Sequence, residues 1–106
     1  MKIAVSDHQH RGELSLSGRF DAHEVEPFNE AVKDLQAKGL KNFVVELGDV
    51  DFIDSAALAA LVGLSRWCES QEAEAVLHHP SDPVRVILEL TGLDQALAVS
   101  NPQHGE

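Results

Sequence analysis

The sequence predicts an α/β sandwich in which a mixed four- to five-stranded sheet packs with three to four helices. Two apolar patterns of period two near the N-terminus indicate paired strands, and three later segments show helical spacing. Short apolar runs alternate with these helical segments, which is typical of strands joined by helices. A chain of 106 residues is the length of one domain, so residues 1–106 are expected to form it.

The first two strands are expected to form a hairpin. The segment "KIAVSD" alternates Ile3 and Val5 with polar neighbours, and "ELSLSG" repeats the pattern with Leu14 and Leu16. A half-buried strand has this period of two. The intervening "HRGE" contains Gly12, which is expected to form the turn.

The first helix is expected to begin near His23 and to be ended by Gly39 as a C-terminal cap. Apolar residues recur at helical spacing between these positions. Pro27 limits how early the helix can start, because proline is tolerated only in a first turn. The run "NFVVEL" that follows is short and continuously apolar, which predicts a strand covered on both faces.

Four further elements complete the order. A helix is expected from about Ser55 to Ser70, and "AEAVLHH" predicts another strand. The segment "SDPVRVILELTG" predicts a helix capped by Ser81 or Asp82, with a proline in its first turn and a glycine at its end. The short apolar run from Ala96 to Val99 predicts an edge strand.

Composition excludes several classes of function. The formal net charge is −10, from 18 acidic and 8 basic residues, whereas nucleic acids and anionic lipids bind basic surfaces. No stretch approaches the roughly 20 apolar residues of a membrane span, so direct membrane insertion is not expected. The N-terminus has no secretory pattern, and the single cysteine, Cys68, fits a reducing compartment. We therefore expect a cytoplasmic protein without a nucleic-acid partner.

The stretch "DFIDSAALAALVG" and the helix it opens carry two different faces. On a helical wheel, one side is expected to pack on the sheet and contains Ala57, Leu58, Leu61, Leu64 and Cys68. A separate stripe of small residues ends in a cation and contains Ser55, Ala56, Ala59, Gly63 and Arg66. Glycine inside a helix costs about 1 kcal/mol relative to alanine, and close approach of a partner is one reason for its presence. The alternative is an exposed face on which small residues do no harm.

Asp54 and Ser55 stand together where this helix begins. Either side chain could cap the free N–H groups, and a cap of this kind contributes about 1 kcal/mol. The pair leaves one side chain free for another role. A phosphate on Ser55 would lie at the helix N-terminus, where free N–H groups and the helix dipole stabilise negative charge. A docked partner with an apolar or acidic surface opposite would not tolerate the phosphate, because its charge would be desolvated or repelled there.

Three stretches, "LSLSGRFDAHEVEPF", "VVELGDVDFIDSAALAALVGL" and "VRVILELTGLDQAL", resemble the STAS domain of bacterial anti-sigma factor antagonists. The resemblance covers about residues 3–99, and its most specific part is the Asp-Ser pair after a hydrophobic strand. It implies a STAS-like fold in which Ser55, with Asp54 beside it, is phosphorylated by the anti-sigma factor, a serine kinase. The unphosphorylated form would bind that kinase and free the sigma factor, and a serine phosphatase would be a further partner.

The resemblance thus implies partner switching in transcription regulation and stress response. The partner-binding residues expected are Asp54, Ser55, Ala56, Ala59, Gly63 and Arg66. The family commonly has a small polar residue and a glycine after Asp-Ser, whereas Ala56 and Ala57 stand here, and the methyl group of Ala57 is expected to crowd the kinase active site. STAS domains also serve as subunits of lipid or anion transporters and as stress-complex scaffolds. A non-catalytic subunit of a lipid ABC transporter or a signalling scaffold is therefore the alternative.

Catalytic motifs are missing from the sequence. No G-x-S-x-G elbow surrounds Ser55, Ser65 or Ser70, and there is no glycine-rich phosphate loop. Cys68 lies on the expected buried face, where cysteine usually acts as a small hydrophobic residue. The sequence therefore predicts neither an enzyme nor a cofactor.

The histidines predict no metal site. His78 and His79 are adjacent on a predicted strand, so they are expected to point to opposite faces and not to bind one metal together. His8 and His10 could share a face, but they have no evident third ligand.

Overall fold

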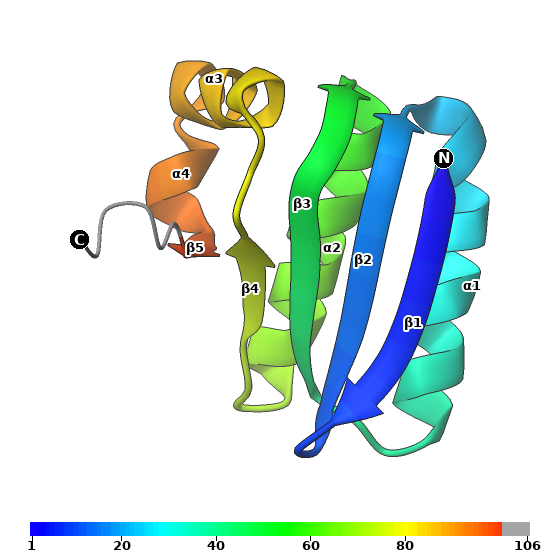
Figure 1. Ribbon diagram of the computed structural model, residues 1–106. Coiled ribbons are helices and arrows are strands. Elements are labelled where there is room, and N and C mark those ends of the chain that lie inside the picture. The colour runs from blue at the N-terminus through cyan, green and yellow to red at the C-terminus, as the bar shows by residue number, and fades with distance from the viewer. Residues whose placement is uncertain (101–106) are drawn as a thin grey trace.

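Two long helices lie behind one face of a five-stranded sheet, and among residues 1–100 no helix covers the opposite face (Figure 1). The computed structural model describes residues 1–100; residues 101–106 of the predicted single domain lie outside the described part. The strands follow the order β1-β2-β3-β4-β5, with β1 and β2 antiparallel and the other neighbours parallel. The predicted α/β sandwich with a mixed sheet is confirmed. The elements are β1 (Lys2–His8), β2 (Arg11–Phe20), α1 (Ala22–Ala37), β3 (Asn42–Ile53), α2 (Ser55–Ser70), β4 (Ala75–His78), α3 (Asp82–Thr91), α4 (Leu93–Ala96) and β5 (Ala98–Ser100).

The hairpin of β1 and β2 turns at Gln9 and His10, not at Gly12. Both turn residues have positive φ angles, 53° and 66°, as a two-residue hairpin turn between twisted strands requires. Gly12 lies within β2, where a Cβ atom would come within 2.8 Å of the Phe43 ring. The predicted turn at Gly12 is therefore wrong, because this glycine makes room for a core side chain.

Helix α1 begins one residue earlier than expected. Asp21 is its N-cap, and the Asp21 carboxylate accepts a hydrogen bond of 3.0 Å from the His23 N–H. Pro27 consequently lies in the second turn of the helix, so the expectation that proline is tolerated only in the first turn, and so limits the start, is wrong here. The helix tolerates it at the loss of one backbone hydrogen bond to the preceding turn. Phe28, Val32 and Leu35 are buried against the sheet, as the helical spacing predicts.

Strand β3 is longer than the apolar run and is covered on one face only. Phe43, Val45 and Leu47 are buried beneath the helices, whereas Val44 and Glu46 are half-buried on the face without helices. The prediction of a strand covered on both faces is wrong. The apolar side chain of Val44 on the open face hid the alternation in the sequence.

Helix α2 spans Ser55–Ser70, as predicted. The expected sheet-facing residues are all buried, and Ser65 joins them. Burial raises the pKa of the Cys68 thiol to about 11, so it is protonated at neutral pH. The interpretation of Cys68 as a small core residue is confirmed.

The C-terminal part adds two helices and an edge strand. Ser81 is the N-cap residue of α3, one of the two predicted, but its hydroxyl donates to the Val50 carbonyl and makes no hydrogen bond to the helix. Gly92 ends α3 with a left-handed φ of 76°, and the short α4 that follows was not predicted. The predicted edge strand is confirmed as β5. No helix within residues 1–100 is both long and apolar enough to cross a membrane.

The first prediction tests the core face of α2. Leu61 is 1% exposed, so Leu61→Ala should lower the free energy of unfolding by about 2–5 kcal/mol, as other truncations in cores do. Urea denaturation of the variant and the parent measures the difference. Glu69→Ala, on the exposed side of the same helix, is the control and should change stability by less than about 0.5 kcal/mol. Equal losses in both variants would contradict the assignment of faces.

Candidate partner-docking site at the start of helix α2

The carboxyl ends of β2 and β3 lie side by side and lead directly into α1 and α2 (Figure 1). The pairing continues past the strands, because the Asp54 N–H donates to the Phe20 carbonyl at 3.3 Å. The first turns of two long helices therefore begin at one edge of the sheet. Ser55 is the first residue of α2 at this edge.

One carboxylate joins the starts of both helices. Asp54 Oδ1 accepts a hydrogen bond of 2.9 Å from the Ala57 N–H in the first turn of α2. Asp54 Oδ2 accepts another of 2.9 Å from the Ala22 N–H at the start of α1. A negative charge at two helix N-termini is stabilised by both dipoles as well as by these hydrogen bonds. Asp54 thereby holds the starts of α1 and α2 together at this edge of the sheet.

Because Asp54 is the cap, Ser55 is free of that role. Asp54 has the extended backbone of an N-cap, and Ser55 follows it as the first helical residue with an exposed side chain. Within residues 1–100 the Ser55 hydroxyl makes no hydrogen bond, and the N–H groups of Ser55 and Ala56 have no protein acceptor. The structure thus divides the Asp-Ser pair into one capping residue and one available hydroxyl beside two free amides.

The same edge carries a cation that the sequence analysis did not identify. The Arg19 guanidinium lies 3.6 Å from the centre of the Phe52 ring, and its Nε is 3.0 Å from Asp21 Oδ2. Arg19 and Phe52 are paired on neighbouring strands. Sequence periodicity holds no signal for this arrangement, since it depends on the register between β2 and β3.

The small-residue stripe of α2, which consists of Ser55, Ala56, Ala59, Gly63 and Arg66, lies on the outer surface. Ala56 is half-buried and the other four residues are exposed. A Cβ atom on Gly63 would meet nothing within 4 Å, so packing inside this chain does not require the glycine.

Two hollows border the small-residue stripe. One of about 370 Å³ lies between α2 and α1 and is lined by Ala59 and Gly63 together with Asn29, Lys33 and Trp67. The other, of about 290 Å³, lies between α2 and α4 and is lined by Arg66, Glu69 and Leu93, among others. The stripe is therefore a low ridge between two grooves, a shape that a partner can approach closely.

Ala57 does not face this surface. Its side chain is 0% exposed, because it lies on the sheet-facing side of α2. The expectation that its methyl group crowds a docking kinase is therefore wrong, since the methyl group packs in the core. The small-residue stripe reaches solvent without contribution from this residue.

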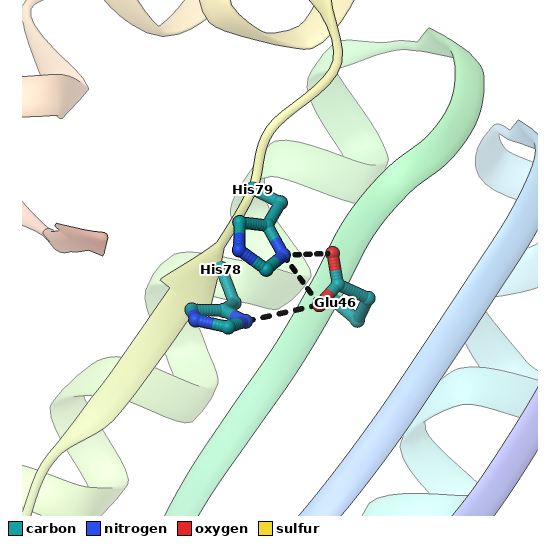
Figure 2. Close-up of side chains that lie close together, drawn as sticks. All are labelled: Glu46, His78 and His79. Atoms are coloured by element: carbon teal, nitrogen blue, oxygen red, sulfur yellow. Dashed lines mark hydrogen bonds and ion pairs between the residues drawn. The ribbon is translucent and has the colours of Figure 1, made fainter. Parts of the chain in front are cut away.

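A second group of polar side chains meets elsewhere, on the open face of the sheet. Nδ1 of His78 and Nδ1 of His79 each lie 2.9 Å from Glu46 Oε2 (Figure 2). The expectation that the two histidines point to opposite faces is wrong. Strand β4 ends at His78, and His79 has a left-handed φ of 52° that breaks the alternation. The sequence signal that was available is Pro80, which often marks the end of a strand.

Comparison with known proteins identifies the family. The model of the STAS domain family matches residues 2–103. The anti-sigma-B factor antagonist of Listeria monocytogenes is 27% identical over 89 residues, covering 84% of this chain and 78% of the relative. The protein of the same name in Staphylococcus aureus is 25% identical over 88 residues, covering 83% and 82% of the two chains.

Solved structures share the fold. The anti-sigma factor antagonist SpoIIAA in its unphosphorylated form superposes with a TM-score of 0.80 at 18% identity, covering 98% of this chain and 92% of that one. Its phosphorylated form, from Bacillus, has a TM-score of 0.74 at 18% identity, covering 98% and 96%. This chain belongs to the STAS domain family, as its resemblance predicted. Anti-sigma factor antagonists are non-catalytic regulatory proteins, which agrees with the prediction that the chain is not an enzyme.

The second prediction tests the shared cap. Asp54→Ala removes the acceptor of two backbone N–H groups at the starts of α1 and α2, and should lower the free energy of unfolding by about 2 kcal/mol. Urea denaturation followed by circular dichroism measures the change. Asp51→Ala removes a neighbouring exposed acid and should cost less than about 0.5 kcal/mol. An Asp54 variant as stable as the Asp51 variant would show that the two hydrogen bonds do not hold this edge.

Proposed function

We propose that the protein is a cytoplasmic anti-sigma factor antagonist that binds an anti-sigma serine kinase and is released when Ser55 is phosphorylated. The observation that carries the proposal is the exposed, unbonded hydroxyl of Ser55 at a helix start that Asp54 already caps. Two relatives named anti-sigma-B factor antagonist match more than four-fifths of the chain, which supports the same role.

The proposed docking surface is the start of α2 with the small-residue stripe. Its contact residues are Asp54, Ser55, Ala56, Ala59, Gly63 and Arg66. Small side chains along a ridge let the backbone of a partner approach closely, and the flanking grooves accept larger partner side chains. With a net charge of −10, the domain favours encounter with a basic or mixed partner surface.

Phosphorylation of Ser55 would act on the complex more than on the fold. A phosphate at the first residue of α2 lies beside the free amides of Ser55 and Ala56, where the helix dipole stabilises an anion. The phosphorylated form of SpoIIAA keeps a fold that superposes on this chain, which supports tolerance of the modification. A partner surface that fits a hydroxyl would instead have to desolvate a dianion. A serine phosphatase would restore the binding form.

A constitutive subunit of a lipid ABC transporter or a signalling scaffold would use the same ridge without the Ser55 hydroxyl. The exposure of the small-residue stripe fits either function, because docking alone needs no modification. Only the chemistry of Ser55 separates the two.

The third prediction concerns the switch. Ser55→Asp places a carboxylate at a helix N-terminus, which favours negative charge by about 0.3–1 kcal/mol, so the variant should fold as well as the parent. It should bind the kinase about tenfold to a thousandfold more weakly, because a charge is buried against a surface that fits a hydroxyl. Ser55→Ala is the matched variant and should bind the kinase without accepting phosphate from ATP.

Binding curves for both variants and the intact mass of the parent after incubation with kinase and ATP measure these outcomes. The parent should gain one phosphate, and Ser55→Ala should gain none. A parent that gains no phosphate, together with variants that bind as it does, would refute the switch and leave the constitutive subunit.

The fourth prediction concerns the ridge. Gly63→Leu adds a large side chain that meets nothing inside this chain, so the isolated domain should stay folded and gain up to about 1 kcal/mol in helix propensity. Binding to the kinase should weaken at least tenfold, because the side chain blocks close approach. Gly63→Ala, with one methyl group, is the control and should bind nearly as the parent does. Full-strength binding by Gly63→Leu would place the partner elsewhere.

A further inference from the structure

Three side chains with metal-ligating atoms converge on the open face of the sheet. Glu46 reaches from β3, His78 from the end of β4, and His79 from the segment that follows (Figure 2). His79 Nδ1 lies 3.0 Å from Glu46 Oε1 and 2.9 Å from Oε2, and His78 Nδ1 lies 2.9 Å from Oε2. One ligand atom from each residue lies within 4.8 Å of the others. Among residues 1–100 no other group of three such side chains comes together in this way.

Strand register brings the first two together. Glu46 and His78 are direct neighbours across β3 and β4. Glu46 follows the buried Val45, and His78 follows the buried Leu77. Because successive side chains on a strand alternate between faces, both Glu46 and His78 point to the face without helices. Strand geometry alone therefore supplies a carboxylate and one imidazole.

The third ligand, the His79 imidazole, reaches the cluster because the backbone after β4 departs from regular strand structure. His79 has a φ of 52°, a left-handed conformation that is uncommon outside glycine, and Pro80 restricts it further from the following position. The segment is held on both sides, since the His79 N–H donates to the Ser100 carbonyl at 2.9 Å and the Ser81 N–H to the Leu47 carbonyl at 3.3 Å. As a result the two imidazole centres lie 3.7 Å apart. An unfavourable conformation held this firmly points to a function for the side chain.

Strand β3 is also irregular beside Glu46. Ser15 pairs with Glu46 and Ser17 with Asp49, so β3 has one residue more than β2 over this interval. Such bulges redirect side chains and are frequent next to functional sites. Gly48 lies in the bulge, where a Cβ atom would come within 3.3 Å of Glu46 Oε1 and 3.4 Å of the His79 carbonyl oxygen. The glycine leaves room for the carboxylate and for the histidine segment.

Strand pairing does not need this arrangement. The His78 imidazole alone would satisfy Glu46 Oε2 across the strands, and Oε1 already accepts from the Gly48 N–H at 3.4 Å, yet His79 Nδ1 lies within 3.0 Å of both oxygens as well. Zinc binds imidazole nitrogen at about 2.0–2.1 Å and carboxylate oxygen at about 2.0–2.2 Å, which places neighbouring tetrahedral ligands about 3.3 Å apart. The distances of 2.9–3.0 Å between the imidazole Nδ1 atoms and the Glu46 carboxylate oxygens approach that value. A small outward movement of these side chains would therefore admit an ion.

We propose that Glu46, His78 and His79 bind one divalent transition-metal ion, with Zn²⁺ as the expected ion. Two imidazoles and a carboxylate form a ligand set that suits zinc and its neighbours and that calcium and magnesium, which prefer oxygen, do not share. The side chains are 33%, 34% and 40% exposed, so an ion can enter from solvent. A hollow of about 420 Å³ lies against Glu46 and His78 and is lined further by Arg11, Glu13, Val44 and Val76, among others, so solvent reaches these two side chains.

Zinc titration of the metal-free 106-residue chain, expressed without a polyhistidine tag, tests the site. Competition with a fluorescent zinc chelator gives the stoichiometry and affinity. The parent should bind one equivalent, and a hundredfold excess of Zn²⁺ over the dissociation constant should raise its melting temperature. Glu46→Gln, His78→Asn and His79→Asn should each weaken binding by about tenfold to a hundredfold or more. Asparagine is chosen because it accepts the left-handed backbone at His79.

His10→Asn is the matched control, since His10 is also a left-handed histidine but belongs to the hairpin turn. It should bind zinc as the parent does and show the same rise in melting temperature. Circular dichroism of the metal-free variants shows whether each is folded at the titration temperature. If a variant is unfolded, the ligands are tested instead on the parent by its Co²⁺ absorption spectrum, because imidazole nitrogen ligands shift the visible bands of the ion. No stoichiometric binding by the parent, equal affinity in all variants, or a Co²⁺ spectrum equal to that of the aqueous ion would overturn the proposal.

Discussion

The carboxylate of Asp54 is the constraint on which the sheet edge at the starts of α1 and α2 depends. Two parallel strands end together, and each continues into a long helix whose first N–H groups lack partners within the helix. Asp54 accepts hydrogen bonds from both helix starts, Ala22 and Ala57, and its own N–H continues the strand pairing to Phe20. The positions of α1, α2 and the ends of β2 and β3 are therefore coupled through one residue. Ser55 gains its exposed position from the same interaction, because a serine that had to cap the helix would turn its hydroxyl toward the backbone.

The one-sided cover of the sheet gives the molecule two distinct surfaces. Over the first half of β3 the helices bury Phe43, Val45 and Leu47 and leave Val44 and Glu46 on the opposite face. The outer side of α2 presents small residues over a rigid core, while the open face of the sheet presents polar side chains on strands. A rigid sheet can hold side chains to a few tenths of an ångström, as a metal site requires. The ridge of α2 instead suits a protein surface, whose fit depends on shape over a larger area.

Three glycines illustrate how differently one residue type is used. Gly12 makes room for the Phe43 ring in the core, and Gly48 makes room for Glu46 and the His79 backbone. At Gly63 a Cβ atom would meet nothing within 4 Å, so packing inside the chain does not require the glycine. Composition and spacing do not separate these cases, because each depends on which atoms the fold places opposite the missing side chain.

The sequence by itself determined the order of the elements except for the short α4, the bounds of α2, its buried face and the family, because hydrophobic periodicity and caps are local and the Asp-Ser motif is contiguous. It also indicated that one of Asp54 and Ser55 would be left free. Only the tertiary structure decided which one, since Asp54 is committed by a hydrogen bond to Ala22, 32 residues away. The turn at Gln9 and His10 and the bare face of β3 were likewise decided by pairing and packing. The meeting of Glu46 with His78 and His79 depends on strand register and on one left-handed residue, and strict alternation along a strand, which is all that periodicity can assume, predicts the opposite.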